Sequence, residues 1–280
     1  MGKSLSTGFI NNKSAKYLGA LFFAMVALSA QGSTLPGRTG SNQAEFGISA
    51  LRFQYEEFNN TGGILDKELG GIPGVSARLT MQRSGWEWES NGSYHHGQVP
   101  YAGQTNLGVP YNTRTDETIG DVSMRFGYWF KAPLSIMPFI GIGYRRWDRN
   151  ILPNSLGGLF ESYRWKYAWA GSKFRLSGDT ASGTVLDIGL LKPLNPELKV
   201  DFKVTYNVEP TVYPEGKLGL RIMSTTHLAF TRHSEMVIEP YYEFWELGRS
   251  PDVTAGSVTL YEPASKTRNL GLNVRFALLF

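Results

Sequence analysis

Apolar and polar side chains alternate with a period of two along residues 269–280, which read NLGLNVRFALLF. One face carries the apolar side chains of Leu270, Leu272, Val274, Phe276, Leu278 and Phe280. The other face carries Asn269, Gly271, Asn273, Arg275 and Ala277, with Leu279 as an exception. Alternation of this length predicts a β-strand with one apolar and one polar face. Such a strand fits a sheet whose apolar face meets lipid and whose edges are all paired.

The same period recurs in nine earlier segments, at residues 46–58, 75–82, 86–89, 121–130, 138–145, 163–169, 186–190, 218–222 and 238–245. In the first segment the alternation changes phase near Ser49 and Ala50, which indicates a β-bulge. Ser84 and Gly85 predict a tight turn. Residues 193–216 alternate in part, but four prolines bracket them, so they form either a long loop or an extra hairpin. We therefore expect ten strands, with twelve as the alternative.

The connections between these segments alternate in length. The links after the first, third, fifth, seventh and ninth strands are long, whereas those after the second, fourth, sixth and eighth are short. This asymmetry is typical of an all-β, closed antiparallel up-and-down transmembrane β-barrel, with short turns at one end and loops at the other. A lipocalin-like barrel in water, with its apolar residues inside, is the competing architecture.

The N-terminal segment has the pattern of a cleavable signal peptide. Three lysines precede the apolar run from Tyr17 to Ala30, which is short for a membrane-spanning helix. Small residues permit cleavage after Ser29 or after Gly32. We expect a signal peptide at 1–29, a lead-in at 30–45 and a barrel at 46–280. A short amphipathic or anchoring helix is the alternative for the first segment.

Taken together, the signal peptide, the alternating strands, the unequal connections and the terminal aromatic residue resemble the small outer-membrane β-barrel proteins of Gram-negative bacteria. The resemblance covers the whole chain as an architecture, without a motif of any functional subfamily. It implies a location in the cell outer membrane and contacts with outer-membrane lipid and lipopolysaccharide. It also implies that the barrel assembly machinery reads Leu278 and Phe280, and that segment 46–58 pairs with the last strand to close the barrel.

Charge and cysteine content narrow the possible partners. The formal net charge is +4, and removing the three lysines of the signal peptide lowers it to +1, so we expect no nucleic-acid partner. The chain has no cysteine, which excludes disulfides, cysteine-ligated zinc and a thiol nucleophile.

Charged residues that alternate with the apolar ones are expected in the lumen, because a charge on the lipid face is costly. These residues are Arg52, Glu56, Arg78, Arg125, Arg145, Arg164, Lys166, Asp187, Arg221, Glu239, Glu243 and Arg275. They either pair across a narrow interior and plug it, or leave an excess of arginine along a path for anions. We favour the plugged interior, since barrels of about ten strands have little free space inside.

Residues for catalysis are scarce. Some outer-membrane hydrolases use a serine two residues after its histidine, but none of His95, His96, His227 and His233 has this spacing. Adjacent His233 and Ser234 point to opposite faces of a strand. An omptin-like site needs acidic pairs and an Asp-x-His sequence, which the chain lacks. The neighbours His95 and His96 are expected to be solvated loop residues, so we expect no metal, no cofactor and no catalytic site.

Two surface features complete the sequence-based expectations. The aromatic face of Tyr163, Trp165, Tyr167 and Trp169 is expected to meet lipid at the membrane interface, with a sugar-binding platform as the alternative. Arg146 and Arg149 are candidates for contact with lipopolysaccharide phosphates, or else form rim salt bridges. The main functional prediction is a non-enzymatic outer-membrane protein for envelope structure or surface interaction. The alternatives are a narrow porin-like channel for small anionic solutes and a lipid or peptide hydrolase.

Overall fold

The computed structural model describes residues 42–104, 108–130, 135–151, 158–178, 183–202, 208–256 and 258–280. The predicted signal peptide lies outside them, while residues 43–45 of the predicted lead-in already belong to the first strand. Ten long strands form the barrel wall: β1 (Gln43–Phe58), β2 (Ile64–Arg83), β3 (Trp86–Gln104), β4 (Pro110–Tyr128), β5 (Ile136–Ile151), β6 (Phe160–Gly178), β7 (Gly183–Asp201), β10 (Gly219–Ala229), β11 (Ser234–Gly248) and β14 (Ala264–Leu279). No helix in the described ranges is long and apolar enough to cross a membrane.

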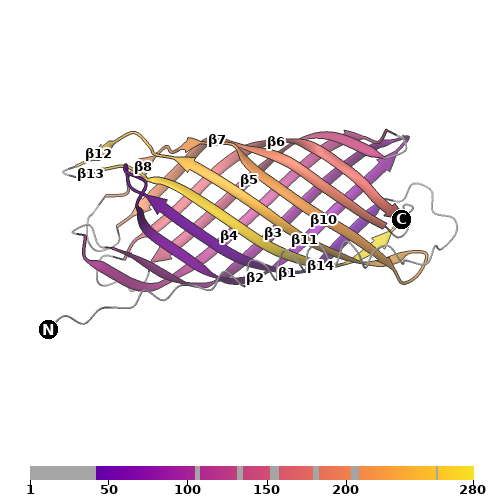
Figure 1. Cartoon of the computed structure of the whole chain (residues 1–280), viewed down its shortest axis with the longest axis horizontal. Coiled ribbons are helices and arrows are strands. Elements are labelled where there is room, and N and C mark those ends of the chain that lie inside the picture. Colours follow the sequence, from indigo (N-terminus) through magenta and orange to yellow (C-terminus); the bar gives the residue numbers. More distant parts are fainter. Residues whose placement is uncertain are drawn as a thin grey trace.

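The barrel closes between its first and last strands, as predicted. All pairings are antiparallel, and β14 lies between β11 and β1, with Gln43 opposite Leu279 and Phe58 opposite Ala264 (Figure 1). The two-residue strands β8 (Thr211–Val212) and β9 (Glu215–Gly216) pair with β7 and β11. Since they add no hairpin to the wall, the barrel has ten strands. The strands β12 (Val253–Ala255) and β13 (Val258–Leu260) form a separate hairpin.

The two ends of the barrel differ. The turn end contains Gln43, the C-terminus and the short connections, among them the turn at Ser84 and Gly85, whose φ angles of 51° and 87° fit a two-residue hairpin. The loop end contains Phe58, Ala264 and the β12–β13 hairpin (Figure 1). Strands reach 20 residues in β2, whereas about 9–11 suffice to cross a bilayer. The wall therefore extends beyond the membrane at the loop end.

The long strands correct several predicted loops. Residues 64–70 belong to β2, residues 96–104 to β3 and residues 193–201 to β7. His95 and His96 are therefore strand residues, and His95 is buried inside the barrel. These segments are polar, and the sequence pattern therefore predicts loops. A strand that extends into water does not need the apolar outer face that marks a transmembrane strand.

An apolar belt surrounds the turn-end part of the barrel and confirms the predicted lipid face. Its outward side chains are largely exposed in the isolated chain, with exposed fractions of 66% for Phe46, 68% for Ile48 and 71% for Ile140. The belt continues through Val75, Met81, Trp86, Val122, Met124, Phe126, Ile142, Ile188, Leu190, Phe276 and Leu278. An exposed apolar band of this extent requires a lipid environment.

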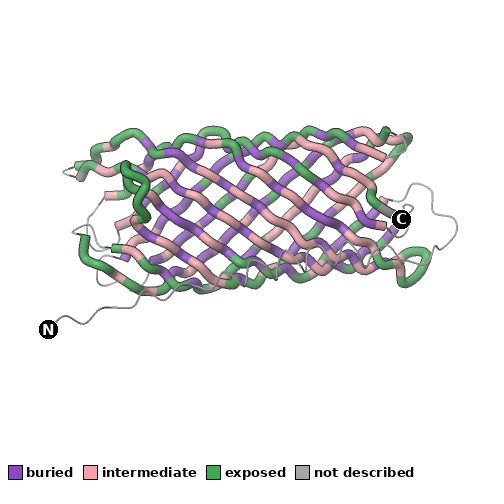
Figure 2. Tube along the Cα trace, viewed as in Figure 1, coloured by how far each residue is buried: buried purple, intermediate pink, exposed green. Residues whose placement is uncertain are grey.

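The apolar side chains of β1 change from the outer to the inner face of the barrel where the wall extends beyond the apolar belt. Figure 2 shows that buried residues alternate with more exposed ones along the strands of the wall. In β1, Phe46 and Ile48 are exposed on the outside, whereas Leu51, Phe53 and Tyr55 are buried inside. The register of β1 with β14 is continuous, so the phase change near Ser49 reflects no bulge. Side chains keep their alternation, but outside the membrane the apolar row turns to the interior. The loop end thus buries its apolar residues as a barrel in water does.

The same inversion corrects the predicted orientation of β6. Tyr163, Trp165, Tyr167 and Trp169 are buried in the barrel interior and do not meet lipid. Arg164 and Lys166, predicted in the lumen, are exposed on the outer surface, as is Arg52 on β1. Alternation distinguishes two faces of a strand, but the height of a residue along the barrel decides which face is apolar.

Candidate functional site

The barrel interior has three zones along its axis. The charged network lies at the level of the apolar belt and contains the lumen residues Glu45, Arg78, Glu87, Glu89, Asp121, Arg125, Arg145, Lys173, Asp187, Arg221, Glu239, Glu243 and Arg275. The aromatic layer above it contains Phe53, Tyr55, Trp147, Tyr163, Trp165, Tyr167 and Trp245. The vestibule is a cavity of about 850 Å³ at the loop end, lined in part by Glu57, Asp66, Tyr101, Glu161 and Glu262.

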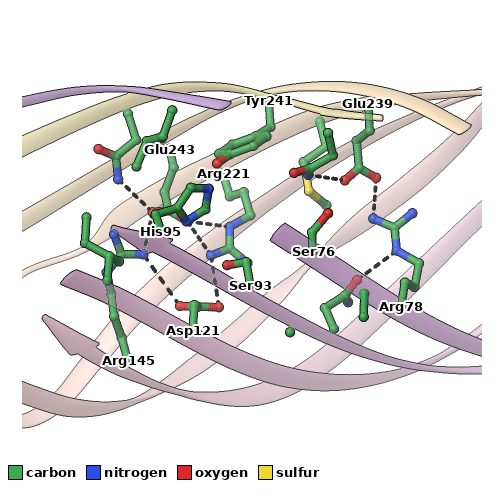
Figure 3. A pocket seen from close by; sticks show the side chains of 18 of the residues that line it. Ser76, Arg78, Ser93, His95, Asp121, Arg145, Arg221, Glu239, Tyr241 and Glu243 are labelled. Atoms are coloured by element: carbon green, nitrogen blue, oxygen red, sulfur yellow. Dashed lines mark hydrogen bonds and ion pairs between the residues drawn. The ribbon is translucent and has the colours of Figure 1, made fainter. Parts of the chain in front are cut away.

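Two arginines share one carboxylate in the upper part of the charged network. Arg145 Nη1 donates to Glu243 Oε1 at 2.8 Å, and Arg221 Nε donates to Glu243 Oε2 at 2.8 Å (Figure 3). Asp121 Oδ2 lies 3.6 Å from Arg145 Nη1. The four groups come from β4, β5, β10 and β11, so the ion pairs cross the lumen and hold opposite walls together.

A second set of ion pairs lies closer to the turn end. Arg275 Nε donates to Glu45 Oε2 at 2.6 Å, and Arg275 Nη2 lies 2.9 Å from Glu239 Oε1. Arg78 pairs with the same Glu239 carboxylate and lies within ion-pair distance of Glu89. The predicted lumen charges Arg78, Glu239 and Arg275 therefore lie together, and Glu45 completes the neutralisation of the two arginines.

A third set links β3, β4, β6 and β7. Arg125 Nη2 donates to Glu89 Oε2 at 2.8 Å, and Arg125 also pairs with Asp187. Lys173 Nζ donates to Glu87 Oε1 at 2.5 Å and to Glu89 Oε2 at 2.6 Å. Sequence reasoning missed Lys173, Glu87 and Glu89 as lumen charges. Glu87 and Glu89 alternate with Trp86 and Trp88 along the strand, and this pattern would have indicated that the two glutamates point into the lumen.

Two small cavities remain inside the charged network, of about 70 Å³ and about 90 Å³, and Arg78 lines both. Cavities of this size hold a few water molecules each. Most of the charged groups around them are engaged in the ion pairs described above, and the guanidinium of Arg175 lies 4.7 Å from the centroid of the Trp129 ring. The described part of the lumen therefore offers water-sized space between largely neutralised charges.

Ser49 and His95 lie in contact with each other, and Asn273 connects Ser49 to Glu239 of the second set of ion pairs. Ser49 Oγ is 2.8 Å from His95 Nε2 and donates to Asn273 Oδ1 at 2.7 Å. Asn273 Nδ2 donates to Glu239 at 3.0 Å, which fixes the amide orientation. The serine proton therefore points to Asn273, and His95 Nε2 donates to the serine. His95 Nδ1 has no hydrogen-bond partner among the described residues.

The aromatic layer fills the lumen above the charged network. Trp147 stacks on Tyr163 with ring centroids 4.6 Å apart and meets Tyr55 edge-on at 4.9 Å. Trp245 meets Trp165 and Tyr167 edge-on at 5.6 and 5.2 Å. The hydrophobic cluster around these rings includes side chains from nine of the ten barrel strands, and none of its described members belongs to β14. The layer therefore forms a packed core between the vestibule and the charged network.

Arg149 lies directly beneath the vestibule and is fully buried, contrary to its predicted contact with lipopolysaccharide. Its Nη1 donates to Glu161 Oε2 at 2.6 Å and to Glu57 Oε1 at 3.0 Å, and its Nη2 donates to Glu68 Oε1 at 3.0 Å. Asp66 Oδ2 lies 3.7 Å from Nη2. The odd-numbered position of Arg149 in β5 directs it inward with Trp147, while Arg146 points outward.

Carboxyl groups outnumber cations around Arg149. The buried acids of this acidic cluster are Glu57, Asp66, Glu68, Glu117, Glu161 and Glu262, and Arg149 is the only cation of the described ranges within ion-pair distance of them. Burial raises the pKa of Glu161 to about 7, with Arg149 opposing the rise and Glu57 adding to it. Burial and the nearby carboxylates also raise the pKa of Glu262 well above its usual range.

The remaining predicted site residues lie on both faces of the barrel wall. Eight predicted lumen charges are buried inside the barrel: Arg78, Arg125, Arg145, Asp187, Arg221, Glu239, Glu243 and Arg275. The prediction that Glu56 lies in the lumen is wrong. Its neighbours Tyr55 and Glu57 point into the barrel, so Glu56 points outward, where it forms ion pairs with Lys67 and Arg268. Leu278 and Phe280 lie on the apolar belt. In the described ranges, no group of three acidic or histidine side chains is arranged to hold a metal ion.

No protein-family model and no curated protein sequence matches this chain. Its structure is similar to that of the outer membrane protease OmpT from Escherichia coli, with a TM-score of 0.55 and 8% identity over 88% of this chain and 99% of that chain. The outer membrane protein OprG from Pseudomonas aeruginosa has a TM-score of 0.42 and 10% identity, over 90% and 99% of the two chains. The toluene transporter TbuX from Ralstonia pickettii has a TM-score of 0.42 and 9% identity, over 86% and 90%.

The similarity to OmpT shows a shared fold. The closed barrel and its exposed apolar belt have the architecture of a transmembrane β-barrel, which is the fold that the sequence resemblance implied.

Proposed function

We propose that this protein is a non-conducting, non-enzymatic outer-membrane barrel that acts as an interaction protein through its loop end, which faces the cell exterior. The observation that carries the proposal is the aromatic layer. Packed rings, with Trp147 and Tyr163 at 0–3% exposure, separate the vestibule from the charged network. A hydrophobic constriction resists wetting and blocks ions, whereas the vestibule above it stays open for binding.

The pairing of the lumen charges supports a closed barrel over the anion channel. An anion path needs arginines whose charge is available to the solute. Here Arg145 and Arg221 share Glu243, and Arg78 and Arg275 share Glu239. Opening this network would leave buried charges unpaired, which costs several kcal/mol for each pair broken.

Conductance in planar bilayers tests closure. We expect the folded wild-type barrel to insert without current steps at either polarity. The double variant Trp147→Ala, Trp245→Ala removes the two central rings of the aromatic layer and shows whether the assay detects an opened lumen. Reproducible wild-type current steps, with anion selectivity, would overturn the proposal in favour of the channel.

Among the described residues, the contact between Ser49 and His95 is the one arrangement that favours a hydrolase, but its hydrogen bonds argue against that role. A serine nucleophile gives its proton to the histidine, and the histidine is oriented by a third group. Here the serine donates to Asn273, and His95 Nδ1 lacks a described partner. We expect no labelling of the folded barrel by a fluorophosphonate probe. Labelling that disappears in Ser49→Ala would show an enzyme.

An outward basic patch on β5 and β6 supports the predicted contact with lipopolysaccharide. Arg146 lies opposite Arg164, and Lys166 lies opposite Tyr144, directly above the apolar belt. Arg146 pairs with Asp148 at 2.9 Å, while exposed Arg164 and Lys166 have no ion-pair partner in the described ranges.

Like charges directly opposite each other destabilise a sheet, and an anion between them reverses the effect. Arginine also binds phosphate through two parallel hydrogen bonds. We therefore propose that this patch holds the phosphates of lipid A, with Arg164 and Lys166 taking the place predicted for Arg149.

Native mass spectrometry of the folded barrel from vesicles of phosphatidylcholine with bisphosphorylated lipid A tests this contact. The variant Arg164→Gln, Lys166→Gln should retain several-fold less lipid A than wild type. The matched variant Arg52→Gln, Lys266→Gln removes two basic residues from β1 and β14 and should retain as much as wild type. Equal retention in all three proteins would refute the patch.

A further inference from the structure

The vestibule combines an excess of buried carboxyls with space for a ligand. Glu57, Asp66, Glu161 and Glu262 line its cavity of about 850 Å³, and each of them is at most 8% exposed. Glu68 and Glu117 lie beneath them and are fully buried. Arg149 neutralises one of these six acids, so the folded chain carries either protons or uncompensated negative charge at this site.

Asp66 supplies an independent sign of a missing partner. Its Oδ2 accepts a hydrogen bond from Tyr101 at 3.4 Å and lies 3.7 Å from Arg149. Its Oδ1 has no hydrogen-bond partner among the described residues, although the side chain is buried and lines the vestibule. A buried carboxylate oxygen without a donor is costly, and a donor from a ligand would satisfy it.

The vestibule wall also contains aromatic rings suited to a cation. Tyr101, Phe202 and Tyr261 line the cavity. The guanidinium of Arg249 already lies 3.9 Å from the centroid of the Tyr261 ring, so this ring is placed for cation–π contact. Rings and carboxylates together suit an organic cation. A bare metal ion needs converging ligands, which the described acids do not provide.

We propose that the vestibule binds an organic polycation with ammonium or guanidinium groups, such as a polyamine or the lysine and arginine side chains of a basic peptide. The inference rests on the proposed function, because it names the ligand class of the loop end. The cationic groups would bind the carboxyls that line the cavity, among them Asp66 and Glu262, and the rings would hold the connecting methylene groups.

Binding of a cation should release protons from the carboxyls of this site. Burial and the neighbouring acids raise the pKa of Asp66 and Glu262, which favours the protonated form of both carboxyls in the empty vestibule. The groups that face them are Tyr55 and Glu57 of β1, Glu68 of β2, Tyr101 of β3, Arg149 of β5, and Glu161 and Tyr163 of β6, and Glu117 of β4 contacts Glu68. A bound cation favours the ionised form and expels the protons.

Isothermal titration of the full folded barrel with spermine, in Tris and in HEPES at equal pH and low salt, measures affinity and proton release together. We expect binding to wild type with net proton release, and affinity that rises with pH. The variant Asp66→Asn, Glu262→Gln should bind at least tenfold more weakly and release fewer protons. The matched variant Glu209→Gln, Glu215→Gln removes two exposed acids and should bind like wild type.

Three outcomes would overturn the inference: no wild-type binding at millimolar spermine, equal affinity of the two double variants, or full competition by calcium chloride at the same ionic strength. Absence of binding in a barrel that stays silent in planar bilayers would refute the polycation site alone. Conductance would refute the closed barrel instead, so the two failures are distinguishable. A heat-modifiability gel confirms that each variant is folded.

Discussion

Arg149 Nη1 lies 2.6 Å from Glu161 Oε2 inside the loop end of the barrel. The two residues belong to β5 and β6, and both are shielded from water by the wall. The same guanidinium also contacts Glu57 and Glu68, so Arg149 offsets part of the negative charge of several acids of the vestibule.

Replacing Arg149 with methionine should strongly destabilise the barrel. The variant leaves several buried carboxyls without their cation, and breaking a buried ion pair from one side costs about 3–5 kcal/mol. Urea unfolding in detergent, followed by tryptophan fluorescence, measures the loss. The control Arg146→Met changes an exposed residue of the same strand and should stay within about 0.5 kcal/mol of wild type. Equal effects of the two substitutions would contradict the role of Arg149.

The raised pKa of Glu161 predicts a pH-dependent stability. Because its pKa is about 7 in the folded barrel and near 4.5 when unfolded, the folded state holds more protons between these values. Stability is therefore fully present below about pH 4.5 and falls as the pH rises through 7, by up to about 3 kcal/mol.

Urea unfolding at several pH values tests this dependence. Glu161→Gln should flatten the decline between pH 5 and 8, because glutamine does not titrate. Glu215→Gln removes an exposed carboxylate and should keep the wild-type profile. A wild-type barrel that gains stability across this pH range would show that the acidic cluster is ionised at little cost.

Glycines on the inner face make room for the large rings. Gly143 lies opposite Tyr167, and a Cβ added at Gly143 would come within 2.2 Å of the tyrosine ring. Gly143→Ala should cost about 1–3 kcal/mol through overpacking. Gly92→Ala, where the nearest side-chain atom would lie 3.9 Å away, should change unfolding by less than about 0.5 kcal/mol. Near-wild-type stability of Gly143→Ala would indicate that Tyr167 moves freely.

Much of the fold was predictable because transmembrane strands carry a strong local pattern. The alternation at 269–280 and at 121–130 identified strands whose apolar faces form part of the exposed apolar belt. The connection lengths then indicated an even number of strands, and the need to pair both edges of the sheet indicated closure between β1 and β14. The eight buried lumen charges follow from the same pattern, since charge cannot face the membrane.

The loop end was less predictable, and the errors share one cause. Arg52, Arg164 and Lys166 lie on strands whose alternation is clear, yet they face outward. Arg149 was assigned to the surface because neighbouring arginines looked like a rim cluster, but it is buried beneath the vestibule. Each assignment required the height of the residue relative to the membrane, which depends on the tilt and register of the neighbouring strands.

The sequence by itself determined the strands, their two unlike faces and the closure of the barrel, because these follow from the period of two and from the need to pair every strand edge in lipid. Only the tertiary structure decided where polarity inverts and which charges meet. Tyr55, Arg149 and Glu262 are far apart along the chain and lie together at the vestibule. Contacts of that kind arise when ten strands converge on one lumen, and no local pattern records them.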